Sequence, residues 1–138
     1  MHHSEHIFAF EKLKVWEEVR ILIKSIYLLT RIYPDDERFG LVSQMRRAII
    51  SVSSNLAEGT SRTGSKDQAH FYQLSYSSLM EVLSQLIVSK DLQYIGDAEY
   101  NEARSKIESV SYLLNQIRKS SLTKLSQPSK PSKPSKPI

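Results

Sequence analysis

The chain has 138 residues and a formal net charge of +4, with 40% hydrophobic and 25% charged residues. This length and composition are typical of one soluble globular domain with its own core. The sequence has no cysteine, which excludes disulfide bonds and thiolate chemistry. No apolar run approaches the roughly 18 residues of a membrane span, and the first residues lack the apolar segment of a secretory signal. We therefore expect a cytoplasmic protein without a membrane contact.

Most of the basic excess lies in the last thirteen residues, SQPSKPSKPSKPI, which hold three lysines and no acid. Without these lysines, 16 basic and 15 acidic residues remain, a net charge of +1. A nearly neutral body weakens any argument from global charge to a nucleic-acid partner. Because proline recurs at every third position of this segment, we expect residues 126–138 to form a disordered basic tail.

The first predicted helix runs from about Phe8 to Tyr33. Its apolar row has helical spacing and consists of Leu13, Trp16, Val19, Ile23, Ile26 and Thr30. Pro34 should end the helix, because proline lacks an N–H donor and disfavours α conformation in the residue before it. Further apolar residues lie beside the row, including Leu22, Tyr27, Leu28 and Leu29. This surplus exceeds what the seam of a monomeric bundle needs, and it favours self-association.

The second predicted helix runs from about Phe39 to Glu58. Its apolar row is Leu41, Met45, Ala48, Val52 and Leu56. Gly59 follows the row, where a helix commonly ends in left-handed geometry. We expect a polar turn to follow.

The third and fourth helices are predicted to begin at Ser65 and Asp97. Ser65 and Gln68 have the spacing of a capping box, and Asp97 is a favourable N-cap residue. The apolar rows alternate steps of three and four residues. They are Ala69, Tyr72, Tyr76, Leu79, Leu83 and Leu86, and then Tyr100, Ala103, Ile107, Val110, Leu114 and Ile117.

These four segments, joined by short connections, predict an all-α protein. Rows that repeat every seven residues favour left-handed, nearly antiparallel packing. We predict an antiparallel up-down-up-down four-helix bundle over residues 7–125, followed by the tail.

The turn after the second helix resembles a phosphate-binding loop only superficially. Gly59 and Gly64 are five residues apart, as in a P-loop, but Ser65 and Lys66 are in the reverse order. A helix precedes the turn, where the P-loop motif requires a strand. We expect an ordinary turn between helices, and an anion at the start of the third helix is a weaker alternative.

No metal, cofactor or catalytic site is predicted. A di-metal bundle needs two Glu-x-x-His pairs, and the nearest match here is Asp67-Gln68-Ala69-His70. No serine can be matched to a His and an Asp in a recognisable motif. We therefore expect a protein that is not an enzyme.

Three polar residues beside the apolar rows are candidates for a structural polar cluster: Asn55, Glu58 and Glu81. Such a cluster would fix the helix register or a subunit contact. The alternative is that the two acids pair with arginines at the rim of the bundle.

Four basic residues are candidates for contacts to nucleic-acid phosphates: Arg46, Arg47, Arg62 and Lys66. A basic strip of this kind binds phosphates with an affinity that falls as salt rises. A solvated face with salt bridges to the many glutamates is the alternative.

The motifs along the first two helices resemble a known family. They are Phe10-x-x-Leu13-x-Val15-Trp16, Tyr33-Pro34, Glu37-x-Phe39-Gly40-Leu41-x-x-Gln44-Met45-Arg46-Arg47-Ala48 and Ser51-Val52-x-x-Asn55-Leu56-Ala57-Glu58-Gly59. Together they are similar to the bacterial four-helix-bundle proteins of the 23S rRNA intervening-sequence family, over about residues 8–120. The third helix departs from the family pattern Ala-x-Gly-Ser-Leu-x-Glu, because Ser75 and Ser77 replace the alanine and the glycine.

The resemblance implies a four-helix bundle that assembles into a ring-like homopentamer. One related protein, the accessory variability determinant of diversity-generating retroelements, is a basic pentamer that binds nucleic acid and a reverse transcriptase. The leading hypothesis is therefore a non-enzymatic, self-associating scaffold. The alternative is an RNA-binding accessory protein that uses the basic strip.

Overall fold

The computed structural model describes residues 4–126, and within them the chain forms helices and no strands. The four long helices are α1 (Lys14–Thr30), α2 (Leu41–Ser61), α3 (Ser65–Asp91) and α4 (Asp97–Ser126). Two short 3-10 helices, η1 (Ala9–Lys12) and η2 (Asp35–Glu37), precede α1 and α2. Of the predicted tail, Ser126 is the last residue of α4. The rest of the tail, residues 127–138, lies outside the described residues.

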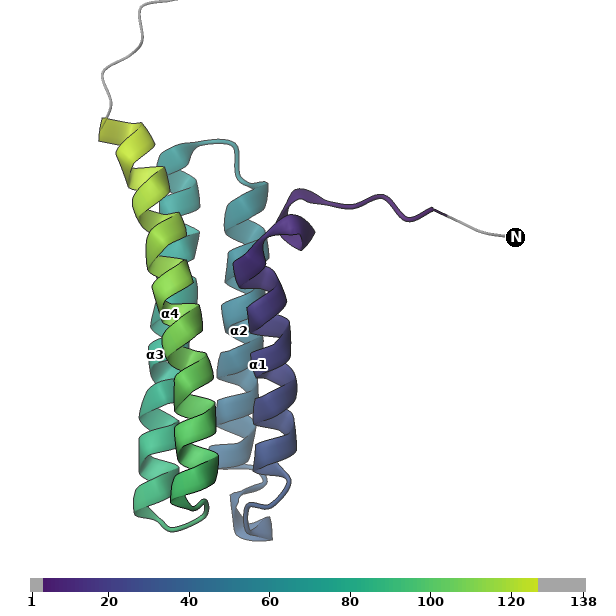
Figure 1. The fold of residues 1–138 in the computed structure, drawn as a ribbon, viewed down its shortest axis with the longest axis vertical. Helices are drawn as coiled ribbons and strands as arrows, with labels where there is room; N and C mark the ends of the chain where they lie inside the picture. Colours follow the sequence, from purple (N-terminus) through teal and green to yellow (C-terminus); the bar gives the residue numbers. More distant parts are fainter. Residues whose placement is uncertain (1–3, 127–138) are drawn as a thin grey trace, which may run out of the picture.

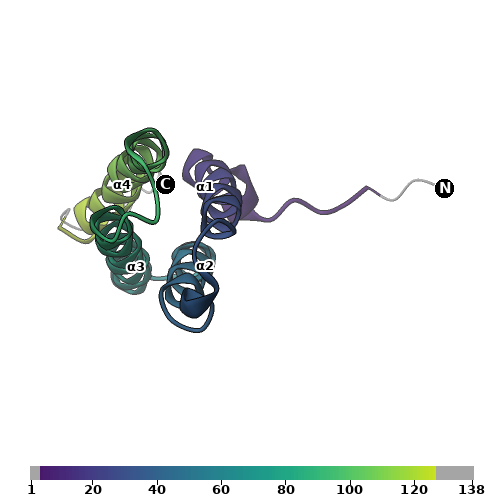
Figure 2. The ribbon, with the colours of Figure 1, turned by 90° about the horizontal axis from the view of Figure 1, so that it is seen from below.

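The long helices alternate in direction and pack side by side (Figure 1). Viewed along the bundle, α1 lies beside α2 and α4, and α3 occupies the diagonal position (Figure 2). The predicted all-α, up-down-up-down bundle is therefore confirmed.

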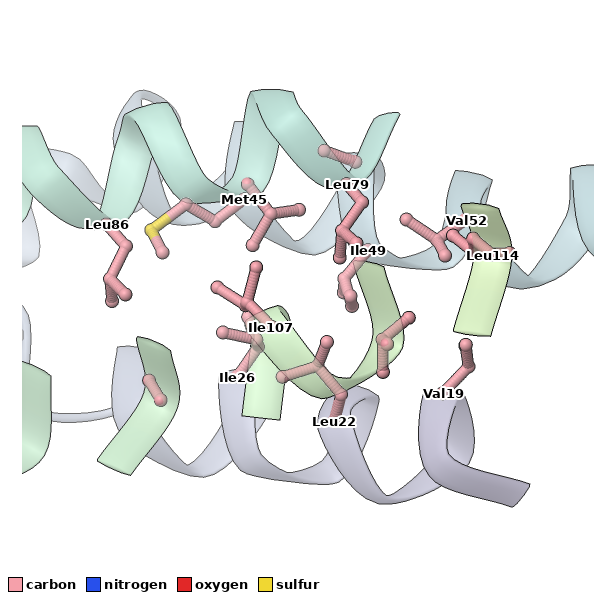
Figure 3. Packing of buried hydrophobic residues seen from close by; sticks show 14 of the residues in the cluster. Val19, Leu22, Ile26, Met45, Ile49, Val52, Leu79, Leu86, Ile107 and Leu114 are labelled. Carbon is pink, nitrogen blue, oxygen red and sulfur yellow. The ribbon is translucent and has the colours of Figure 1, made fainter. Parts of the chain in front are cut away.

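The apolar rows of all four helices meet on the bundle axis (Figure 3). The largest fully buried side chains include Leu22 and Ile26 of α1, Met45 and Ile49 of α2, Leu79 and Leu86 of α3, and Ile107 and Leu114 of α4. Full burial of each such side chain contributes about 1.5–3 kcal/mol relative to exposure. This core holds the helices together and fixes which of their faces remain outside.

The predicted start of the first helix is wrong. The chain forms η1 and then the extended residue Leu13, with φ −78° and ψ 134°, so that α1 begins at Lys14. The Glu11 carboxylate accepts a hydrogen bond of 2.9 Å from the Phe8 N–H, which closes the short turn. The segment before η1 runs away from the bundle (Figure 1).

Two predicted caps are also wrong. Gly64 occupies the N-cap of α3, and Gln68 donates its side-chain N–H to the Arg62 carbonyl at 2.9 Å rather than closing a box with Ser65. At α4, the Gly96 carbonyl accepts the Tyr100 N–H, and the Glu99 carboxylate accepts the Gly96 N–H at 2.7 Å. Both helices thus begin after a glycine. Its backbone occupies the N-cap position, and no N-cap side chain bonds to the free N–H groups of the first turn.

Gly59 does not end α2, and no glycine of residues 4–126 has a positive φ. It is buried within the last turns of the helix, against α3. A Cβ atom at Gly59 would lie 2.8 Å from Cε1 of Tyr72 and 3.0 Å from Cβ of Phe71. The glycine is therefore explained by the close approach of two helices.

Candidate functional site

Arg46, a predicted phosphate contact, is bound to the end of α1. Its Nε donates to Thr30 Oγ1 at 2.9 Å, and its Nη2 donates to the Tyr27 carbonyl at 3.2 Å. Its guanidinium also stacks 4.6 Å from the centre of the Tyr27 ring. Arg46 thus binds a carbonyl in the last turn of α1, which also accepts from the Thr30 hydroxyl at 3.3 Å.

Arg47 points to another neighbour, α3. Its Nη2 lies 3.8 Å from Glu81 Oε2, and both side chains are largely exposed. Consecutive residues of a helix are about 100° apart around its axis. Arg46 therefore faces α1 while Arg47 faces α3, and the two do not form one strip.

Arg62 is surrounded by acids and an aromatic ring. Its guanidinium lies 2.8 Å from Glu58 and 3.6 Å from Asp67, and it stacks on Phe71. Lys66, one turn away, is exposed and makes no ion pair within residues 4–126. Of the four basic candidates, Lys66 alone has no intramolecular partner in the described part of the chain.

The candidate polar residues Asn55 and Glu81 belong to the contact between α2 and α3, whereas Glu58 lies apart from them. Asn55 donates to the Ser51 carbonyl and hydroxyl, and Ser51 shares a hydrogen bond of 2.9 Å with Ser78 of α3. Glu81 joins the same contact through Arg47. Glu58 instead pairs with Arg62 near the turn.

Ser75, which departs from the family pattern, forms another link in this contact. It is fully buried, and its hydroxyl donates to the Val52 carbonyl of α2 at 2.7 Å. Ser77 is exposed and lies 3.4 Å from the Gln73 amide. The replacement at 75 therefore bears on helix packing, and the one at 77 leaves the interior unchanged.

A polar cluster that the sequence did not indicate lies at the opposite end of the bundle. Glu37 accepts from the Leu41 N–H at 3.0 Å and from the Tyr94 hydroxyl at 2.7 Å. These two bonds, the backbone bond first, lower the pKa of Glu37. The bond to Glu37 is the largest cause that raises the pKa of Tyr94. Glu37 thus caps the start of α2 and ties it to the connection between α3 and α4.

An exposed apolar stripe runs along the outside of α1 and into the turn that follows it. Ile21, Leu28 and Ile32 are each more than half exposed. A groove of about 350 Å³ lies between α4 and the part of this stripe formed by Leu28 and Ile32. Its other wall consists of Glu99, Glu102 and Lys106 of α4. We call this surface the α1/α4 face.

No arrangement typical of catalysis or metal binding accompanies this face. Within residues 4–126, His, Asp and Glu side chains do not gather in groups that could hold a metal ion. Over the same residues, no helix is long and apolar enough to cross a membrane.

Fold and surfaces together define a four-helix-bundle protein whose marked features are helix contacts and an apolar outer face. The model of the 23S rRNA-intervening sequence protein family matches residues 11–116. The chain belongs to this family, as the sequence motifs indicate.

One solved structure that the chain resembles is a protein of unknown function from the S23 ribosomal protein family of Bacteroides thetaiotaomicron VPI-5482. The TM-score is 0.69 at 18% identity, and the match covers 76% of this chain and 98% of the other. At this identity the likeness shows the fold alone. No curated protein is similar to the chain.

Proposed function

We propose that the chain is a non-enzymatic, cytoplasmic scaffold that self-associates through the α1/α4 face into a ring-like homopentamer. The observation that carries this proposal is the exposed stripe of Ile21, Leu28 and Ile32. Large contiguous apolar patches are rare on monomeric proteins and commonly mark interaction sites. The number five is taken from the family resemblance.

The surroundings of the stripe suit a second copy of the chain. Its rim carries both signs of charge, with Glu17, Arg20 and Lys24 on α1 and Glu99, Glu102 and Lys106 on α4. A stable contact buries about 800 Å² per partner, with an apolar centre and a polar rim. The stripe supplies such a centre, and the mixed charges allow a neighbour of the same composition to match the rim.

Substitution of the stripe tests the contact. The double variant Leu28→Lys/Ile32→Lys places two charges at its centre, where an interface would exclude water. We expect light scattering after gel filtration to give about five times the 15.9 kDa chain mass for the native protein. The double variant should give the mass of one chain.

Leu122→Lys is the matched control, because Leu122 is also an exposed leucine but lies near the end of α4. This variant should keep the native mass. A double variant that assembles like the native chain would show that the α1/α4 face is not the contact. A native chain that stays monomeric would refute the scaffold proposal itself.

Nucleic-acid binding, the alternative function, is supported less well. Three of its four candidate residues have intramolecular partners: Thr30 and Tyr27 for Arg46, Glu81 for Arg47, and Glu58 with Asp67 for Arg62. At Arg47 and Arg62, a phosphate would have to compete with carboxylates. The geometry therefore favours self-association as the leading function.

A further inference from the structure

A small pocket at the lower end of the bundle gathers three arginines. It has a volume of about 150 Å³ and lies between the end of α1, η2 and the start of α2. Arg31, Arg38 and Arg46 line it, together with Thr30, Tyr33 and Asp35. It shares Arg46 with the basic strip expected from the sequence, but it lies away from Arg62 and Lys66 at the turn between α2 and α3.

The three guanidinium groups lack carboxylate partners. Arg47, Arg62 and Arg104 each lie within 4.0 Å of a carboxylate oxygen. Within residues 4–126, neither Arg31 nor Arg38 forms an ion pair, and Arg46 bonds only to uncharged oxygens. Like charges around one pocket repel each other, so this arrangement favours an anion between them.

The neighbouring acids do not neutralise the pocket. Glu37 is bonded to the Leu41 N–H and the Tyr94 hydroxyl, and the negative charge of Asp36 also acts on Tyr94. Of the three acids of η2, Asp35 alone lines the pocket. The lining thus carries three positive charges and one negative charge.

One of the three arginines is already held in place. The bonds of Arg46 to Thr30 and Tyr27, and its stacking on Tyr27, fix the guanidinium before any ligand arrives. Neither bond uses Nη1, so this donor has no hydrogen-bond partner in the described residues. A donor fixed in advance loses little conformational entropy on binding.

We propose that this pocket binds a phosphate group, either as free inorganic phosphate or as part of a nucleic-acid backbone. The guanidinium fork donates two parallel hydrogen bonds to such oxygens. The volume is that of a few water molecules at about 30 Å³ each, enough for one tetrahedral oxyanion. Arg46 would provide the fixed donor, and the exposed Arg31 and Arg38 would close on the ligand from α1 and from the turn. This site does not depend on self-association.

Calorimetric titration of the full chain tests the proposal in two arms. The first probe is inorganic phosphate, and the second is a ten-nucleotide oligouridylate at two salt concentrations. The test variant is Arg31→Gln/Arg38→Gln, which leaves Arg46 and its bonds to α1 intact. The control is Lys119→Gln/Lys124→Gln, which removes the same charge from exposed positions of α4.

We expect the test variant to bind at least tenfold more weakly in one or both arms, and the control to bind like the native chain. An effect with phosphate alone identifies the free ion as the ligand. An effect with the oligonucleotide, reduced further by salt, identifies the backbone of a nucleic acid. Equal affinities of the test and control variants in both arms, or no binding in either arm, would overturn the proposal. Circular dichroism of each variant checks that the helices are retained.

Discussion

At the scale of single residues, Gly59 has no room for a side chain. The atoms nearest to an added Cβ belong to the buried ring of Tyr72 and to Cβ of Phe71, which is close to the backbone. Neither can move away as the end of a flexible side chain would. The sequence predicts Gly59 as a left-handed residue after the second helix, whereas it lies within α2. The sequence does not reveal that α3 approaches there.

Gly59→Ala tests this explanation. Alanine is favoured over glycine within a helix by about 1 kcal/mol, while overpacking costs about 1–3 kcal/mol. Because the contacts at 2.8 and 2.9 Å involve a buried ring, we expect the steric cost to win. The free energy of unfolding in urea should therefore fall, by up to about 2 kcal/mol.

Gly64→Ser is the control for this change. A Cβ at Gly64 would meet nothing within 4 Å, and the residue is the N-cap of α3, where serine is favourable. Its stability should equal or slightly exceed that of the native chain. A Gly59→Ala protein that is more stable than the native one would contradict this explanation. It would show that the gain in helix propensity at this position exceeds the steric cost of the added methyl group.

At the scale of elements, the ends of the helices depend on side chains from elsewhere in the chain. Glu37 caps α2 and binds Tyr94, while Arg46 of α2 binds the end of α1. The sequence predicts where the helices lie, because periodicity is a local property. It does not predict these bonds, because they depend on which ends of the bundle come together.

The Glu37 cap makes stability depend on pH. Since its pKa is lowered in the folded chain, the cap contributes stability above the pKa of the unfolded state, ordinarily near 4.5. That contribution is lost as the pH falls through the lowered value. Glu37→Gln should therefore unfold at a lower urea concentration than the native chain at pH 7, and the difference should shrink below about pH 4.

Tyr94→Phe separates the two bonds of Glu37. It removes the second cause of the lowered pKa and keeps the bond from the Leu41 N–H, which is the larger cause. The pH dependence should therefore weaken without disappearing. A constant difference between Glu37→Gln and the native chain from pH 7 to pH 3 would contradict this account of the cap.

At the scale of the whole molecule, the sequence predicts the fold well and the candidate site poorly. The row of α4 is a good example: Ile107, Val110 and Leu114 are all buried as predicted. In the row predicted for the first helix, Trp16 and Ile23 are only half-buried and pack against the core. Val15 and Leu22 lie in the core in their place. A seven-residue apolar repeat predicts that a segment is helical. Which face of that helix turns towards the core depends on the neighbouring helices.

The basic residues show the same limit. Arg46 and Arg47 are adjacent in the sequence, but Arg46 binds α1 and Arg47 binds α3. Arg31 and Arg46 are distant in the sequence, but they line one pocket. Such groupings arise from tertiary packing. The apolar surplus predicted for the first helix shares only Leu28 with the exposed stripe, because Leu22 is fully buried and Tyr27 and Leu29 pack against the core.

The most direct test of self-association is the sedimentation velocity of the native full-length chain over a concentration series from one to a hundred micromolar. We predict a single dominant species of about five times the 15.9 kDa chain mass, present throughout the series. A species with the mass of one chain at every concentration would contradict the central claim.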